Sequence, residues 1–347
     1  MRVEFEGTAG PGGFPEAGCP CAACGRVSAG HRRPLEFVVD GVLRLTSPAP
    51  HAVAAPHVPP GHTLTRTTLG AEIVSPGGGR LLVPGDVSAG SPGAPFDVVV
   101  MDLLEDPSRL GALRRAGAAG PETTVVAAWI DHRVASEAEL ARRARLWGAH
   151  AVPDGAVLDT GRSLPPLPRP ARRTLLLGGA RSGKSAEAEL RLAAEPHVTY
   201  VATGDSGGDA DWLARIDAHR RRRPPHWDTA ETTDLPALLD AATAGTALLI
   251  DGIGTWLAAV LGECGAWDDA PGADDGVRVR CAELVSSWRR TPARLVAVSD
   301  ETGLGVVPAT RSGRLFRDAL GALNQALTRE SEETCLVVAG RPVPLPV

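Results

Sequence analysis

The segment from Thr174 to Ser185 constrains the fold of this chain more than any other. It contains the pattern G-x-x-x-x-G-K-S, with a short apolar run before the glycines and a stretch rich in Ala, Glu and Leu after them. Strand, glycine loop and helix are the context of a phosphate-binding loop, because the N–H groups at the start of the helix then point at the phosphates. We therefore predict an α/β fold that binds a nucleoside triphosphate through Gly178, Gly179, Ala180, Arg181, Ser182, Gly183, Lys184 and Ser185.

Lys184 is the only lysine among the 36 lysine and arginine residues of the chain. A planar guanidinium cannot replace a compact ammonium group in a tight phosphate site. The single lysine thus favours a phosphate site over the alternative, a glycine-rich turn before an ordinary helix. We predict that Lys184 is catalytic and reaches the β- and γ-phosphates, while the Ser185 hydroxyl binds Mg²⁺.

Asp251 directly follows the apolar run 247–250, which is typical of a buried strand. A carboxylate at the carboxyl end of a parallel strand lies beside the phosphate loop in such a fold. Asp251 is therefore the second predicted Mg²⁺ ligand. The alternative is that it caps the next helix.

Strand-like and helix-like patterns alternate along residues 174–347 and predict a P-loop NTPase-like domain, with a mostly parallel sheet and helices on both faces. The acidic, glycine-rich segment 263–275 predicts a loop. Four prolines in Leu164–Pro170 predict an extended linker over residues 159–173. Residues 1–158 then form a separate domain, in which 37–45 is typical of a hairpin turning at Asp40-Gly41.

Cys19, Cys21 and Cys24 form a C-x-C-x-x-C cluster. Three thiolates within so short a span suit a structural Zn²⁺. The fourth ligand has to come from elsewhere, either from His31 or from a more distant histidine. The alternative is a reduced, metal-free loop.

A second unusual stretch runs from Arg215 to Pro224 and contains His219, one helical turn after Arg215, and four arginines at 220–223. Such a basic run is often a solvated face. Arginine forks also bind phosphate oxygens, and a histidine beside them can bind the ligand or act as a nucleophile. We predict that Arg215 and Arg220 bind the nucleotide and that His219 is catalytic.

Five motifs then occur in a set order: Gly178–Ser185, Tyr200–Thr203, Arg215–Arg220, Arg223–Glu231 and Arg317–Gln325. Over residues 173–341 they resemble the bifunctional adenosylcobinamide kinase / adenosylcobinamide-phosphate guanylyltransferase family of cobalamin biosynthesis. The resemblance implies phosphorylation of adenosylcobinamide by ATP or GTP, followed by GMP transfer from GTP through a guanylylated histidine. It places that histidine at His219 and the GTP contacts at the phosphate loop, Thr203, Glu231 and Asp251. It also implies a homo-oligomer, commonly a trimer.

Some positions depart from that family. Asp300 and Thr302 stand where the family usually has Asn and Val, and Gly254 stands where Thr is usual. All three lie near the expected corrinoid side, so the departures concern the corrinoid contacts more than the nucleotide site. The alternative function is a P-loop kinase or NTPase of other specificity, in which His219 only binds phosphate.

Residues 1–155 loosely resemble the phosphodiesterase branch of the metallo-β-lactamase fold, an αββα sandwich. The resemblance rests on the opening Val3–Gly10, the cysteine cluster and a late strand–helix–strand order. The catalytic signature H-x-H-x-D-H of that family is absent, so we expect a catalytically degenerate domain. Asp131-His132 ends a predicted strand as a family ligand would, whereas an isolated histidine is more often a surface or packing residue. The alternative is a metal-dependent phosphoesterase.

Composition argues against several partners. The net charge of −5 gives no reason to expect nucleic acid. No apolar run approaches the ~18 residues of a membrane span. The first residues lack the apolar core of a signal peptide, and we expect a cytoplasmic protein.

Overall fold

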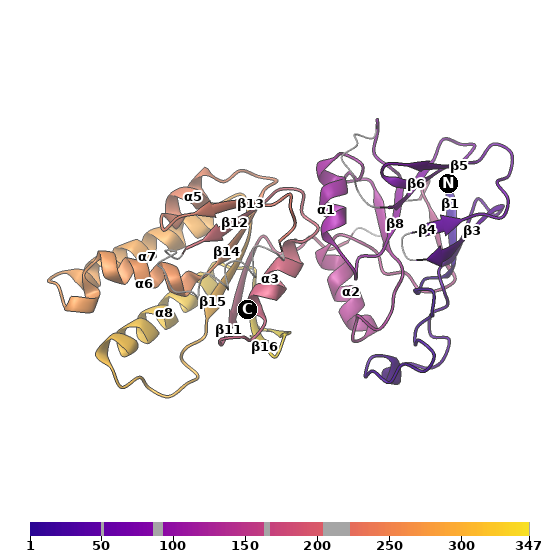
Figure 1. Ribbon diagram of the computed structural model, residues 1–347. Coiled ribbons are helices and arrows are strands. Elements are labelled where there is room, and N and C mark those ends of the chain that lie inside the picture. Colours follow the sequence, from indigo (N-terminus) through magenta and orange to yellow (C-terminus); the bar gives the residue numbers. More distant parts are fainter. Residues whose placement is uncertain (50–51, 86–92, 163–166, 204–222, 347) are drawn as a thin grey trace. The chain divides into compact units, whose positions relative to one another are not determined.

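The computed structural model describes residues 1–49, 52–85, 93–162, 167–203 and 223–346. The chain divides into two compact units (Figure 1). Met1–Pro170 with Ala193–Pro196 form the N-terminal unit, and Ala171–Leu192 with His197–Val347 form the C-terminal unit. None of the described helices combines the length and the hydropathy that crossing a bilayer requires.

The C-terminal unit is built on a seven-stranded sheet in the order β13-β12-β14-β15-β11-β16-β17. Neighbouring strands pair in parallel except β16 and β17. The predicted mostly parallel sheet is therefore confirmed. Its strands are β11 Arg173–Gly178, β12 Val198–Ala202, β13 Asp228–Glu231, β14 Ala247–Asp251, β15 Arg294–Asp300, β16 Glu333–Val338 and β17 Arg341–Pro344.

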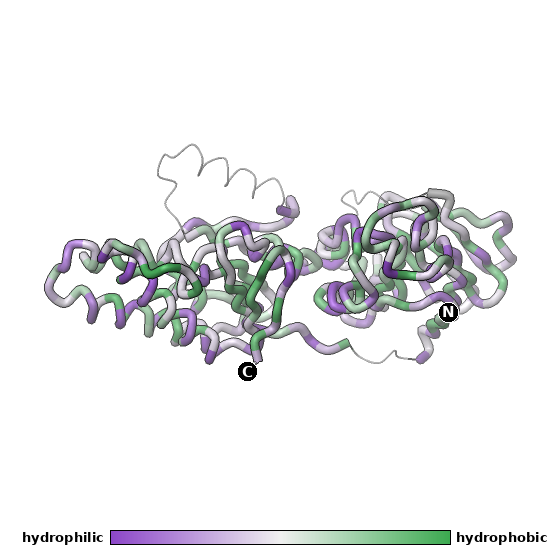
Figure 2. The backbone as a smooth tube through the Cα atoms, turned by 90° about the horizontal axis from the view of Figure 1, so that it is seen from below, coloured by the Kyte–Doolittle hydropathy of each residue, from purple (hydrophilic) through white to green (hydrophobic). Residues whose placement is uncertain are grey.

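Helices cover both faces of this sheet. In β11, Leu175 and Leu177 join one buried cluster, whereas Leu176 joins another. Alternate residues of a strand point to opposite faces, so the two clusters lie on opposite sides. The first cluster includes residues of α5 to α8, and the second includes residues of α3. Figure 2 shows strongly hydrophobic stretches inside this unit. The helices are α3 Lys184–Leu192, α5 Leu235–Ala241, α6 Ile253–Glu263, α7 Ala273–Arg290 and α8 Arg311–Arg329.

The segment 263–275, predicted to be a loop, contains more helix than expected. Between the end of α6 and the start of α7 it forms the short 3₁₀ helix η2, Ala266–Asp268. Ala266 and Ala273 are buried in the larger cluster. Gly265 and Gly272 adopt positive φ of 72° and 79°, where glycine is favoured. The glycines therefore mark turns between helices.

The N-terminal unit contains two five-stranded sheets, in the orders β10-β1-β2-β3-β4 and β5-β6-β7-β8-β9. Residues of both sheets, among them Phe5, Phe37, Ile73 and Val100, share one buried cluster, so the sheets pack as a sandwich. The strands are β1 Arg2–Gly7, β2 Glu36–Val39, β3 Leu43–Ala49, β4 Ala52–Ala54, β5 Thr63–Thr67, β6 Gly70–Val74, β7 Arg80–Pro84, β8 Val98–Met101, β9 Thr124–Ala127 and β10 Ala156–Asp159.

The hairpin predicted at Asp40-Gly41 joins β2 to β3. Both turn residues have positive φ, 52° and 73°, and the N–H group of Val42 donates to the carbonyl oxygen of Val39 at 3.1 Å. The strands pair antiparallel, with Val39 opposite Leu43.

The αββα sandwich expected from the sequence has a helical layer outside each of its two sheets, and the N-terminal unit differs from it in these layers. Its described helices are α1 Ser108–Arg115, α2 Glu137–Leu146 and the 3₁₀ turn η1 Cys24–Arg26. Figure 1 places α1 and α2 on the same side, next to β8. The first sheet turns one face to the core and carries charged residues on the other, where Arg44 pairs with Glu6 at 2.7 Å. A charged outer face needs no helical cover, and the described residues form no helical layer there.

Candidate functional site

The loop between β11 and α3 is packed tightly. A Cβ on Gly178 would lie 2.6 Å from the Ser182 Oγ atom, and Gly183 has a φ of +95°. Both positions therefore require glycine, for lack of space in the first and for backbone conformation in the second. The Ser182 hydroxyl is buried and finds no hydrogen-bond partner among the described residues. Helix α3 begins at Lys184, so its N-terminal N–H groups face the loop as phosphate binding requires.

Lys184 extends across the loop to the neighbouring strand. Its Nζ atom lies 2.8 Å from Asp300 Oδ1 and donates to the carbonyl oxygen of Gly179 at 3.1 Å. Asp300 ends β15 and is in register with Gly178 of β11. Its side chain is 46% exposed. Although Asp300 was expected on the corrinoid side, the structure places its carboxylate against the predicted catalytic lysine.

Ser185 and Asp251, the two predicted Mg²⁺ ligands, lie together. The Ser185 hydroxyl donates to Asp251 Oδ1 at 3.1 Å, and the Tyr200 hydroxyl donates to Asp251 Oδ2 at 2.6 Å. Hydroxyl and carboxylate oxygens are hard ligands of the kind that Mg²⁺ prefers. The donor set therefore fits this ion.

Thr203 and Glu231 lie on the same edge of the sheet as the phosphate loop. Thr203 follows β12, is buried, and donates to the carbonyl oxygen of Gly252 at 2.6 Å. Glu231 ends β13, in register with Ala202. The carboxyl ends of parallel strands form the ligand-binding edge of such sheets. Because β12, β14 and β15 separate β13 from β11, Glu231 would meet a different part of a nucleotide than Lys184.

Three predicted site residues, Arg215, His219 and Arg220, belong to the segment 204–222 and lie outside the described residues. The description resumes at Arg223, whose guanidinium carbon lies 3.2 Å from the centre of the Tyr200 ring. The roles of the first three residues remain predictions from the sequence.

Two residues of this edge were absent from the predicted set. Tyr200 appeared only within a motif, and Asp300 only as a departure from the family pattern. The signal for both was position, since each lies at or near the carboxyl end of a predicted parallel strand. The pairing of Tyr200 with Asp251 and of Asp300 with Lys184 could not be inferred from the spacing of these residues in the sequence.

The cysteine cluster of the N-terminal unit acquires a fourth partner. The ligand atoms of Cys19, Cys21, Cys24 and His132 all lie within 4.8 Å of one another. His132 Nδ1 lies 3.6 Å from Cys19 Sγ and 3.9 Å from Cys24 Sγ. Ligands at ~2.3 Å from a tetrahedral zinc ion are about 3.8 Å apart, so the four residues fit this metal.

His31, the nearer of the expected fourth ligands, is engaged elsewhere. Its Nε2 atom lies 2.8 Å from Glu137 Oε1.

The thiols of the cysteine cluster differ in acidity: the backbone N–H of Cys24 lowers the pKa of Cys21, whereas burial raises the pKa of Cys24 to about 11. Binding of a cation would favour the thiolate form of both.

A phosphoesterase site finds little support in this unit. Beside His132, Asp131 pairs with Arg133 at 2.8 Å, and Arg133 also donates to the buried Asp102 at 2.7 Å. Across the described ranges, the Cys₃His cluster is the one group of three or more His, Cys, Asp or Glu side chains that could hold a metal ion together. A dinuclear cage is therefore not formed by the described residues.

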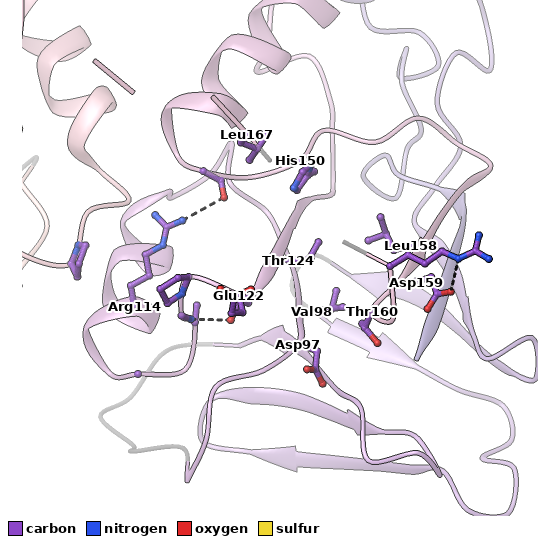
Figure 3. Close-up of a pocket in the computed structure, with 18 of the residues that line it drawn as sticks. Asp97, Val98, Arg114, Glu122, Thr124, His150, Leu158, Asp159, Thr160 and Leu167 are labelled. Atoms are coloured by element: carbon purple, nitrogen blue, oxygen red, sulfur yellow. Dashed lines mark hydrogen bonds and ion pairs between the residues drawn. The ribbon is translucent and has the colours of Figure 1, made fainter. Parts of the chain in front are cut away.

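A polar pocket of the N-terminal unit is lined by Asp97, His150, Asp159 and other residues (Figure 3). It lies at the amino ends of β8 and β9, whereas ligands of parallel sheets usually bind at the carboxyl ends. Burial lowers the pKa of His150, so its imidazole is neutral at neutral pH. The pocket contains none of the predicted site residues.

Residues 174–345 match a family model described as cobinamide kinase / cobinamide phosphate guanyltransferase. Three similar proteins are named bifunctional adenosylcobalamin biosynthesis proteins. CobP from Pseudomonas aeruginosa is 44% identical over 177 residues, covering 50% of this chain and 96% of the relative. CobU from Salmonella typhimurium is 38% identical over 177 residues, covering 48% and 95%. CobU from Escherichia coli is 35% identical over 174 residues, covering 48% and 95%.

Proposed function

The chain belongs to the cobinamide kinase / cobinamide phosphate guanyltransferase family, and from this we infer that its C-terminal unit is the bifunctional enzyme of cobalamin biosynthesis. It phosphorylates adenosylcobinamide with a nucleoside triphosphate and then transfers GMP from GTP to adenosylcobinamide phosphate. The products are adenosylcobinamide-GDP and pyrophosphate. The observation that carries this proposal is the phosphate loop, whose Lys184 and Ser185 meet carboxylates from two neighbouring strands.

In the kinase step the substrate hydroxyl attacks the γ-phosphorus. A new O–P bond forms, the bond between the β-bridging oxygen and the γ-phosphorus breaks, and the hydroxyl proton is released. Lys184 and the N–H groups at the start of α3 neutralise the charge on the transferred group. Ser185 and Asp251 would hold Mg²⁺, which supplies further charge neutralisation when bound.

In the guanylyl step we assign the nucleophile to His219. A ring nitrogen attacks the α-phosphorus and pyrophosphate leaves. A phosphate oxygen of adenosylcobinamide phosphate then attacks the same phosphorus and the N–P bond breaks. A histidine with a pKa near ~6.5 is largely neutral at pH 7 and can attack without a strong base. This role is supported by the sequence motif and the family resemblance.

The proposal is tested with the full chain, Mg²⁺, adenosylcobinamide and either ATP or GTP, with the products followed by mass spectrometry. We expect adenosylcobinamide phosphate first and adenosylcobinamide-GDP only when GTP is present. Triphosphate hydrolysis without a change in the corrinoid would favour a P-loop NTPase of other specificity.

For the N-terminal unit we propose one structural Zn²⁺ on Cys19, Cys21, Cys24 and His132, in a domain without phosphoesterase activity. The support is the geometry of the cluster, which matches tetrahedral coordination. Zinc would hold the cysteine segment, next to η1, against the turn that follows β9.

We also propose that the protein is cytoplasmic and forms a homo-oligomer, a trimer by family resemblance. Light scattering on the purified protein tests the second statement. A monomer at micromolar concentration would contradict it.

A further inference from the structure

Tyr200 is the only tyrosine of the chain, and it belongs to a buried cluster of the C-terminal unit. It belongs to β12 and is 5% exposed. Its ring joins the cluster that also contains Ala188 of α3 and Trp227. A phenylalanine would fill this space equally well, so packing alone does not account for the hydroxyl group.

The hydroxyl group of Tyr200 is directed at a predicted Mg²⁺ ligand. It donates to Asp251 Oδ2 at 2.6 Å, while the other carboxylate oxygen, Oδ1, accepts from Ser185 at 3.1 Å. The two bonds together fix the rotation of the carboxylate and turn Oδ1 toward Ser185. An ionised carboxylate can only accept hydrogen bonds, so the Tyr200 hydroxyl group is the donor in this pair.

The ring of Tyr200 carries a second contact. The Arg223 guanidinium carbon lies 3.2 Å from the ring centre, a cation–π arrangement. Arg223 Nε is buried and has no hydrogen-bond partner within the described part of the chain. The stacked cation thus limits movement of the ring on one side, which in turn limits movement of the hydroxyl group.

We propose that Tyr200 is a positioning residue that orients the Asp251 carboxylate, so that Asp251 Oδ1 and Ser185 Oγ together receive the divalent cation of the bound nucleotide. The inference rests on the proposed function, since it assumes that Mg²⁺ enters with a triphosphate at this edge. Partners that orient a metal ligand commonly change metal affinity by about 10- to 100-fold.

The test measures metal binding rather than turnover. Mn²⁺ binding to the full chain is followed by electron paramagnetic resonance with a non-hydrolysable GTP analogue present. Tyr200→Phe keeps the ring and its stacking and removes only the hydroxyl group. We expect it to weaken Mn²⁺ binding about tenfold and to leave the affinity for the metal-free analogue unchanged within about twofold.

Trp227→Phe is the matched control, because it alters the same buried cluster and its indole N–H has no hydrogen-bond partner among the described residues. It should bind Mn²⁺ like the wild type. Equal losses in Trp227→Phe and Tyr200→Phe would assign the effect to packing and overturn the proposal. Wild-type Mn²⁺ affinity in Tyr200→Phe would also overturn it.

A second readout uses the single tyrosine directly. With ¹³C-labelled tyrosine the wild type gives one Cζ signal, which should shift when Mg²⁺ is added to the analogue complex. In Asp251→Asn the metal-induced shift should disappear; its persistence would contradict the coupling. If the wild type binds neither analogue nor metal, the proposed function fails, and this outcome is distinct from a failure confined to Tyr200.

Discussion

Lys184 makes two contacts that a bound triphosphate would have to replace, one to Asp300 and one to the backbone of Gly179. Two unit charges about 4 Å apart attract by about 4 kcal/mol at an effective dielectric constant near ~20. A loss of that size in the transition state slows a reaction by about 10³-fold.

Lys184→Ala should therefore depress both the kinase and the guanylyl transfer activities by about 10³-fold, because both begin from bound triphosphate. Steady-state assays of the two products measure the effect. Lys184→Arg is the control, because it keeps the positive charge and changes only the shape of the cationic group. Since a guanidinium does not fit this loop, the arginine variant should also be impaired. Wild-type turnover in Lys184→Ala would show that the loop does not hold the phosphates.

We expect Asp300 to weaken triphosphate binding, because its carboxylate pairs with Lys184 and competes with the phosphate for this lysine. Asp300→Asn should tighten triphosphate binding about two- to fivefold, the scale of a partly exposed ion pair of ~0.5–1 kcal/mol. Calorimetric titration with a GTP analogue measures the affinity, and Glu301→Gln, one residue further on, is the control. Weaker binding in Asp300→Asn would mean that the carboxylate supports the nucleotide.

The residues of the site were predictable to the extent that chemistry follows from local spacing. The phosphate loop is contiguous, and Asp251 directly follows an apolar strand, so both were read from the sequence. The contact between Tyr200 and Asp251 spans 51 residues, and that between Cys24 and His132 spans 108. Such pairs depend on strand order, which local patterns do not specify.

At the level of elements, the cysteine segment around η1 and the turn after β9 meet through His132 rather than through His31. Zinc coordination would cross-link these two segments. Structural zinc commonly contributes directly to folding.

His132→Ala should lower the zinc content and zinc affinity of the protein and reduce its melting temperature, whereas His31→Ala should bind zinc normally. Elemental analysis and competition with a chromophoric chelator measure the first two quantities. Equal zinc binding in both variants would assign the fourth ligand elsewhere. Full zinc loss in His31→Ala alone would support the other candidate.

The alternation of strands and helices in the C-terminal half was predictable, because apolar periodicity is local and the strands are buried on both faces. In the N-terminal half the sequence led us to expect helices outside both sheets. The outer face of the first sheet is instead charged in the described residues, through Arg44, Glu6 and Glu36. Alternation of Val3 and Phe5 with charged neighbours in β1 already indicated a solvated face.

On the scale of the whole molecule, the family similarity covers residues 174–345 and places the proposed chemistry in the C-terminal unit. The N-terminal unit has its own core and its own cysteine cluster. In the proposed mechanism one nucleotide site of the C-terminal unit serves both the kinase step and the guanylyl step. The guanylyl step also passes through a covalent intermediate. His219, on which that intermediate depends, lies outside the described residues.

The most direct test incubates the full chain with GTP labelled at the α-phosphate, without corrinoid, and follows the label and the intact mass of the protein. We predict an adduct of one GMP that is stable in base and labile in acid, as a phosphoramidate is. His219→Ala should lose the label and guanylyl transfer while keeping kinase activity. The other candidate nucleophile in this stretch is His226, which lies between Pro225 and Trp227, and His226→Ala should label like the wild type. Undiminished labelling of His219→Ala, or guanylyl transfer by the wild type without any labelled protein, would contradict the account.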